Sequence, residues 1–303
     1  MTRTPVLVLL AATLTLLATS DPAVRRDFES PVDGSVQPYR LYVPPESAQD
    51  PLPLVVVLHG AHGDENTYFD RYLNPRTGER VLESLARERG YIVASPRRYQ
   101  GEYERDVLAM IDDIAESHPV RRDQVFLTGH SSGGVGTWHI GYRNPQRFAA
   151  LAAVGSAFTA QPYLLHSIIR PAQYGKPMMY VQGVRDELVP NRQARALVTA
   201  MQPQLSNFVY REFPDAHGSL GTTSLPAVFD FFDSVRNEQP VMESDDPTEA
   251  EFALVKAAKG KRTVRLAKSR KPVPSVKSKA KPQRRLGRNS KPAKRSGSAK
   301  RRA

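Results

Sequence analysis

Residues 127–138 read LTGHSSGGVGTW, so the end of an apolar strand runs straight into a cluster of glycines and serines. Ser131 is the centre of a G-x-S-x-G pattern that begins at Gly129 and ends at Gly133. The pattern is weak by itself, but a strand before it and a helix after it are the context of a nucleophile elbow. Side chains at the two glycines would collide with the neighbouring strand and helix. The alternative is that Ser131 only caps a helix after an ordinary glycine turn.

Apolar runs and amphipathic segments alternate on both sides of this stretch, which predicts an α/β fold. The expected strands are 39–44, 52–60, 91–96, 123–130, 148–158, 176–184 and 207–213, and the expected helices are 79–90, 103–119, 132–144, 191–201 and 224–235. Such alternation predicts a mostly parallel central sheet with helices on both faces. Chemistry in such sheets gathers at the carboxyl ends of the strands, where each polar cluster of this chain is expected.

A serine hydroxyl needs a neighbouring base before it can attack, and histidine is the usual one. The chain has seven histidines, and His217 is the one that follows the last predicted strand. The order nucleophile, acid, base therefore favours His217. His130 is expected to pack beside the nucleophile, and His139 to have a structural or pocket-lining place on the next helix. The other histidines are His59, His62, His118 and His166.

The acid that orients the base is expected after the strand 176–184. Asp186 comes first after that strand and is favoured for this reason, with Glu187 as its rival. Asp215 is a second rival, but it lies two residues from His217 and is more typical of a turn. The carboxylate would orient the imidazole and stabilise its protonated form.

A developing oxyanion needs backbone N–H donors, one after the nucleophile and one in the loop after an early strand. Ser132 would supply the first, and the sequence LHGAHGDE places Ala61 to supply the second. His59 would anchor that loop, and Gly60 would let it turn. No metal-ligand or phosphate-binding motif is present in the sequence, so neither a metal nor a cofactor is expected.

These motifs, together with GVRDELVP and PDAHG, resemble those of the α/β-hydrolase superfamily. Within it, the layout of residues 36–235 is similar to esterases near the prolyl-oligopeptidase catalytic domain, a group with feruloyl-esterase-like and polyhydroxybutyrate-depolymerase-like members. The resemblance implies a serine hydrolase that works through an acyl-enzyme without a cofactor. Two departures are His62, where glycine is common, and the lack of an N-terminal propeller, which favours esters over peptides.

The two ends of the chain differ from the expected catalytic domain, 21–237. Residues 1–20 combine Arg3 with an apolar run and a small-residue end, which predicts a cleaved signal peptide and export to the periplasm or medium. A membrane anchor is the alternative, but the run is shorter than the ~20 residues of a span. An acidic linker is expected at 238–251 and a disordered basic tail at 252–303.

The charge of the chain is concentrated in that tail. Of the 43 Lys and Arg residues 20 lie from Lys256 onward, where no Asp or Glu occurs. The tail has three interpretations: it is functionally silent, it tethers the protein to an anionic surface, or it binds nucleic acid. The predicted export signal argues against nucleic-acid binding.

The expected activity is hydrolysis of a carboxylic ester, on a small molecule or linked to a polymer. A serine peptidase acting on short peptides and a polyanion-binding protein acting through the tail are the alternatives.

Overall fold

The computed structural model of the chain describes residues 23–45, 50–156, 175–202, 205, 207–240 and 243–245. The predicted signal segment 1–20, the basic tail 252–303 and the larger part of the acidic linker lie outside these residues. The domain boundaries predicted from composition therefore stay predictions.

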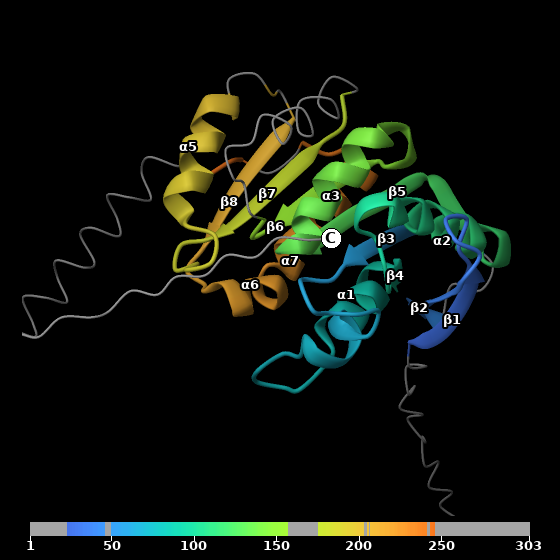
Figure 1. Cartoon of the computed structure of the whole chain (residues 1–303). Coiled ribbons are helices and arrows are strands. Elements are labelled where there is room, and N and C mark those ends of the chain that lie inside the picture. Colours follow the sequence, from blue (N-terminus) through green and yellow to red (C-terminus); the bar gives the residue numbers. More distant parts are fainter. Residues whose placement is uncertain are drawn as a thin grey trace, which may run out of the picture. The chain divides into compact units, whose positions relative to one another are not determined.

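The described strands form one sheet, which confirms the predicted α/β fold (Figure 1). They are β1 (Val24–Glu29), β2 (Val36–Tyr42), β3 (Leu52–Leu58), β4 (Ile92–Pro96), β5 (Val120–His130), β6 (Ala150–Val154), β7 (Met178–Gly183) and β8 (Phe208–Phe213). Their order in the sheet is β1-β2-β4-β3-β5-β6-β7-β8. The pairs β1–β2 and β2–β4 are antiparallel and the other pairs are parallel, so β5 lies near the middle of a mostly parallel sheet.

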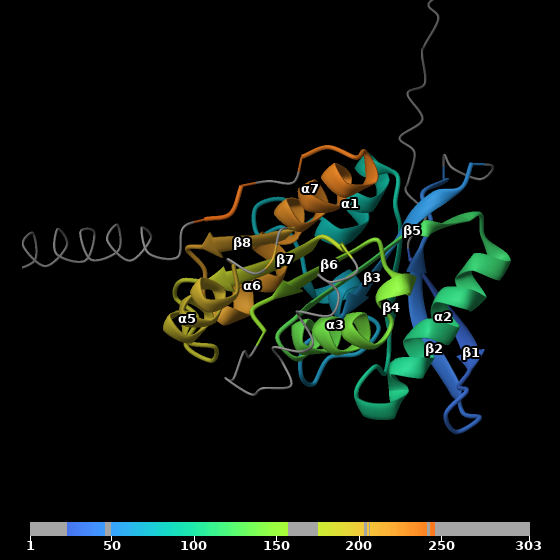
Figure 2. The same ribbon diagram turned by 90° about the horizontal axis from the view of Figure 1, so that it is seen from above.

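Helices cover both faces of the sheet, with α2, α3 and α5 on one side and α1 and α7 on the other (Figure 2). The described helices are α1 (Val81–Arg89), α2 (Glu104–Ser117), α3 (Ser132–Arg143), α5 (Asn191–Met201), α6 (His217–Thr223) and α7 (Leu225–Arg236), with single turns η2 (Thr67–Arg71), η3 (Gly101–Tyr103) and η4 (Pro145–Arg147). None of these helices is long and apolar enough to cross a bilayer.

Each face of the sheet has its own apolar core because side chains alternate along a strand. In β5, Val125 and Leu127 pack with α2 and α3, whereas Phe126 packs with α1 and α7. The central strands are buried on both faces, which explains their continuous apolar runs. This double burial fixes the carboxyl end of β5, where the polar residues lie.

Three features differ from the expectations drawn from the sequence. β1 was not expected, because its sequence VRRDFE is mostly charged, and the strand is an exposed edge that pairs with β2 alone. The short helix α6 was not expected either, because HGSLGTT is rich in residues that disfavour helices. The strand expected at 148–158 is shorter, since β6 ends at Val154 and Gly155 follows with a φ of 51°.

Candidate active site

Ser131 stands in the turn between β5 and α3 with a φ of 58° and a ψ of −119°. A positive φ is strained for any residue other than glycine, and strain of this kind clusters at functional sites. The two flanking glycines make this turn possible. A Cβ on Gly129 would lie 2.5 Å from the carbonyl oxygen of Gly133, and a Cβ on Gly133 would overlap the carbonyl oxygen of Leu58. The turn therefore requires glycine at both positions.

His217 lies beside the hydroxyl of Ser131. Its Nε2 is 2.9 Å from Ser131 Oγ, although the two residues are 86 positions apart in the sequence. The sequence placed His217 in a loop, but it is the first residue of α6. Its side chain is largely buried, with 13% exposed, so the imidazole is held in one position while one edge faces Ser131.

Asp186 lies on the other side of the same imidazole, where its Oδ2 is 2.7 Å from His217 Nδ1. Its Oδ1 accepts backbone hydrogen bonds from Leu188 (3.0 Å) and Val189 (2.8 Å), and its side chain is fully buried. These bonds hold the carboxylate in place. Because a carboxylate can only accept, His217 Nδ1 carries a hydrogen and Nε2 is the free acceptor that faces Ser131.

The two rivals of Asp186 are placed elsewhere. Glu187 is exposed to solvent. Asp215 accepts hydrogen bonds from the hydroxyls of Ser219 (2.9 Å) and Thr223 (3.0 Å), so it stabilises α6 from the loop before that helix. Neither carboxylate is paired with His217.

His130 packs against His217 with 4.6 Å between the ring centroids. It is buried, and its Nδ1 lies 3.3 Å from the hydroxyl of Tyr72. Burial, together with the neighbouring His217, lowers the pKa of His130 to about 4. His130 is therefore neutral at physiological pH, and it does not reach Ser131 as a base.

The loop after β3, in which the sequence predicted an oxyanion donor, runs beside Ser131. Both ring nitrogens of His59 contact carbonyl oxygens, Nδ1 that of Gly60 at 2.8 Å and Nε2 that of Arg97 at 3.0 Å. A Cβ on Gly60 would lie 3.6 Å from Ser131 Cβ, so this loop approaches the nucleophile closely. Ala61 is exposed at the turn of the loop, and His62 follows it with a φ of 62°.

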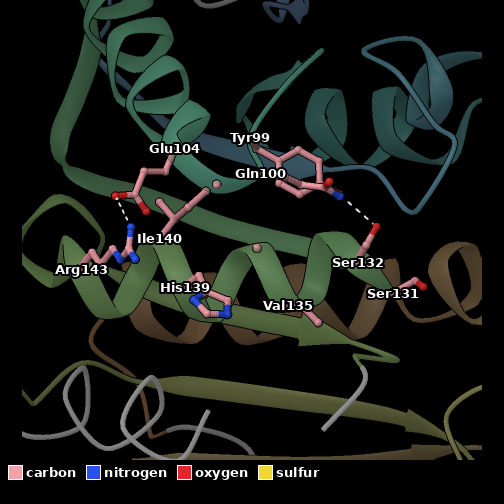
Figure 3. Close-up of a pocket in the computed structure, with 11 residues that line it drawn as sticks. Tyr99, Gln100, Glu104, Ser131, Ser132, Val135, His139, Ile140 and Arg143 are labelled. Carbon is pink, nitrogen blue, oxygen red and sulfur yellow. Dashed lines mark hydrogen bonds and ion pairs between the residues drawn. The ribbon is translucent and has the colours of Figure 1, made fainter. Parts of the chain in front are cut away.

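A pocket of about 480 Å³ opens beside Ser131 and runs along α3 (Figure 3). It is lined by Tyr99, Gln100, Gly101, Glu104, Ser131, Ser132, Val135, Gly136, His139, Ile140 and Arg143. The ion pair between Glu104 and Arg143, at 3.0 Å, lies at the end away from Ser131 (Figure 3). His139, for which the sequence predicted a structural or a pocket-lining place, lines the pocket. Burial lowers its pKa.

Two residues of the site were missed in the sequence. Tyr99, shortly after β4, contacts both the loop after β3 and the start of α3. Gln182 in β7 directs its side-chain nitrogen to Asp186 Oδ2 (3.4 Å) and to the carbonyl oxygen of Val189 (2.9 Å). A polar residue inside the buried run MMYVQG was the signal for Gln182, and an aromatic residue just past a strand end was the weaker signal for Tyr99.

Within the ranges that the structure describes, no group of three or more His, Asp or Glu side chains could hold a metal ion.

Several known proteins are similar to this chain. A family model described as serine aminopeptidase, S33, matches residues 95–173. The bifunctional acetylxylan esterase/xylanase XynS20E of Neocallimastix patriciarum is 25% identical over 203 residues, which is 60% of this chain. The chain spans only 28% of the length of that relative.

Two solved structures share the fold. The fluorophosphonate-binding serine hydrolase F of Staphylococcus aureus is similar with a TM-score of 0.60 and 18% identity, over 70% of this chain and 98% of that one. The ferulic acid esterase AmCE1/Fae1A of Anaeromyces mucronatus is similar with a TM-score of 0.54 and 14% identity, over 67% of this chain and 86% of that one. The sheet order, the elbow and these structures together show that the chain has the α/β-hydrolase fold.

Proposed function

We propose that the protein is a serine hydrolase that cleaves carboxylic esters through an acyl-enzyme. The observation that carries this proposal is the unbroken chain of contacts from Asp186 through His217 to Ser131, at 2.7 and 2.9 Å, on a strained elbow beside a pocket. A hydroxyl in this setting is activated by the imidazole, which takes its proton as the oxygen attacks.

The reaction proceeds in two halves at the same atoms. Ser131 Oγ forms a bond to the ester carbonyl carbon, its proton moves to His217 Nε2, and the carbonyl oxygen becomes an oxyanion. The C–O bond to the alcohol then breaks, and His217 returns the proton to the departing oxygen. Water repeats the sequence on the acyl-enzyme, releasing the acid and restoring Ser131. Asp186 stabilises the protonated imidazole in both halves.

The oxyanion is assigned to the backbone N–H groups of Ala61 and Ser132. Supporting this assignment, Ser132 begins α3, where N–H groups lack partners within the helix, and the loop with Ala61 runs beside Ser131. Loss of one such donor typically lowers the rate by about 10²–10³-fold.

A peptidase is the second candidate, because the family model that matches residues 95–173 is described as a serine aminopeptidase. An aminopeptidase has to recognise a charged amino group, and a free carboxylate in the pocket would suit that purpose. Among the described residues that line this pocket, the acid is Glu104, which is paired with Arg143. The pocket therefore fits an uncharged ester better than a peptide N-terminus.

The proposal is tested with purified protein and p-nitrophenyl acetate, p-nitrophenyl butyrate and alanine p-nitroanilide as substrates. We expect turnover of the esters, and labelling by a fluorophosphonate probe at Ser131. The variant Ser131→Ala should lose both turnover and labelling while it keeps the wild-type melting temperature. Turnover of the anilide alone would favour the peptidase, and a folded wild type that is neither labelled nor active would refute both.

We also propose export through residues 1–20 and electrostatic binding of an anionic surface through residues 252–303. The support is sequence composition, namely the apolar leader and the excess of Lys and Arg. Mass spectrometry of the mature N-terminus tests the first proposal. Retention on a heparin column that weakens steeply with salt, and is lost in a chain ending at Asp245, tests the second.

A further inference from the structure

Tyr99 joins the two parts of the chain from which the oxyanion donors are proposed to come. Its hydroxyl donates to the carbonyl oxygen of His59 at 2.5 Å. The same oxygen lies 3.1 Å from Ser132 Oγ. Because a tyrosine hydroxyl has one hydrogen, which goes to His59, the Ser132 hydroxyl is the donor in the second contact. One buried oxygen thus holds the oxyanion loop and the start of α3 at a fixed separation.

The ring of Tyr99 is fixed as firmly as its hydroxyl. Tyr99 is 2% exposed, and its ring packs edge-on against the His59 ring with 5.0 Å between centroids. The ring also lies against Gly136, where a Cβ would come within 2.8 Å of two ring carbons. Gly136 therefore keeps open the space that the ring fills, and Tyr99 has one position.

The contact with His59 also sets the direction of backbone groups. In a trans peptide the C=O and the following N–H point in opposite directions. A hydrogen bond to the His59 carbonyl therefore orients the N–H of Gly60, and with it the start of the turn that leads to Ala61. His59 itself is held by its ring contacts with Gly60 and Arg97, so the loop is fixed at both its side chain and its backbone.

We propose that Tyr99 is a positioning residue that aligns the two oxyanion donors by tying His59 to Ser132. This inference rests on the proposed esterase function and adds a residue to it. Tyr99 acts before the reaction begins, because its hydroxyl is already engaged by His59 and Ser132. Its contribution should appear in the transition state, where the oxyanion exists, and not in the binding of the ester.

The variant Tyr99→Phe removes only the hydroxyl. We expect kcat for p-nitrophenyl butyrate to fall about 10- to 100-fold, because a misplacement of ~1 Å in an active site can cost ~10²-fold. The KM should change less than about twofold, because the apolar ring that lines the pocket is kept. Phenylboronic acid, whose boron accepts Ser131 Oγ to form a tetrahedral adduct, should bind more weakly by the same factor as kcat falls.

The matched control is Tyr91→Phe, which also removes a buried hydroxyl, one that donates to Asp233 at 2.8 Å on the α7 side of the sheet. The melting temperature of Tyr91→Phe should fall about as much as that of Tyr99→Phe. Its kcat and boronate affinity, however, should equal those of the wild type. In the double variant Tyr99→Phe/Ser132→Ala, the loss should be smaller than the product of the single losses, because one contact is shared.

Two results would overturn the inference while leaving the esterase standing. One is a Tyr99→Phe enzyme with wild-type kcat and boronate affinity, and the other is an equal loss of kcat in Tyr91→Phe. A wild type that neither turns over the ester nor binds the boronate would instead overturn the proposed function together with the role of Tyr99.

Discussion

At the scale of single residues, two neighbouring imidazoles have opposite environments. His217 is paired with the buried carboxylate of Asp186, whose Oδ2 lies 2.7 Å from His217 Nδ1. His130 lies 4.6 Å away between ring centroids, and its Nδ1 lies 3.3 Å from the hydroxyl of Tyr72. The buried His130 therefore stays neutral, so that a proton on His217 meets no second positive charge. The neutrality of His130 has a measurable consequence for stability.

The stability of the protein should fall in acid because of His130. Its pKa is about 4 in the folded protein, below the ordinary histidine value of 6.5, so the unfolded chain takes up the proton first as pH falls. The contribution of neutral His130 to the free energy of unfolding is intact above pH ~6.5 and is lost as pH falls toward 4. At pH 4.5 this loss is roughly 2–3 kcal/mol. Urea unfolding of the wild type and of His130→Gln at pH 7 and pH 4.5 measures it.

The variant should lose less stability than the wild type between the two pH values, by about that amount. Comparing the two proteins at each pH cancels the titration of all other groups. Parallel losses in the two proteins would show that His130 does not remain neutral in the folded state.

At the scale of the elements, α3 packs unusually close to the carboxyl end of β3. Gly133, in the first turn of α3, lies against the carbonyl oxygens of Leu58 and His59, and a Cβ there would come within 2.7 Å of the second and closer to the first. Backbone atoms on both sides leave little room to shift. The helix can therefore begin directly behind Ser131 only if this residue lacks a side chain.

The variant Gly133→Ala should accordingly be destabilised by about 1–3 kcal/mol or more, the cost of overpacking a well-packed interior. It should also lose most fluorophosphonate labelling, because α3 and the Ser131 elbow move together. Gly218→Ala in α6 is the matched control, since a Cβ there meets nothing within 4 Å. In a helix, alanine at such an open position should stabilise by about 0.5–1 kcal/mol. Equal urea midpoints for the two variants would contradict this account of α3.

The same elements show what the sequence could and could not predict. The strands β3, β5 and β7 could be predicted because burial on both faces gives a continuous apolar run. The helix α2 could be predicted because burial on one face gives the helical period. β1 and α6 were not readable, because an exposed edge strand and a short helix gain their stability from neighbours. The contacts of Tyr99 with His59 and Ser132 join segments that are distant in the sequence, so only a weak local signal pointed to it. Gln182 contacts Asp186 and Val189 nearby in the chain, and the polar residue within the buried run MMYVQG was a usable signal.

At the scale of the whole molecule, the sheet ends at β8, whose outer edge is covered by residues after α7. The N–H of Tyr210 donates to Ser244 Oγ (2.6 Å), the N–H of Asp245 donates to the Tyr210 carbonyl (2.7 Å), and the N–H of Glu212 donates to Asp245 Oδ2 (2.7 Å). An uncovered edge strand invites pairing with other chains. Ser244 and Asp245, which lie in the predicted acidic linker 238–251, therefore contact the edge of the sheet.

Chains that end at Asp245 and at Met242 should consequently differ in stability. The first keeps all three hydrogen bonds to β8, and we expect it to unfold at the same urea concentration as the full chain. The second should lose roughly 1–3 kcal/mol, since each hydrogen bond contributes about 1 kcal/mol, and it should associate more readily through the bared edge. Urea unfolding and light scattering measure both effects, and esterase turnover should persist in both chains because Ser131, Asp186 and His217 are present. Identical unfolding of the two truncated chains would place the end of the domain before residue 243.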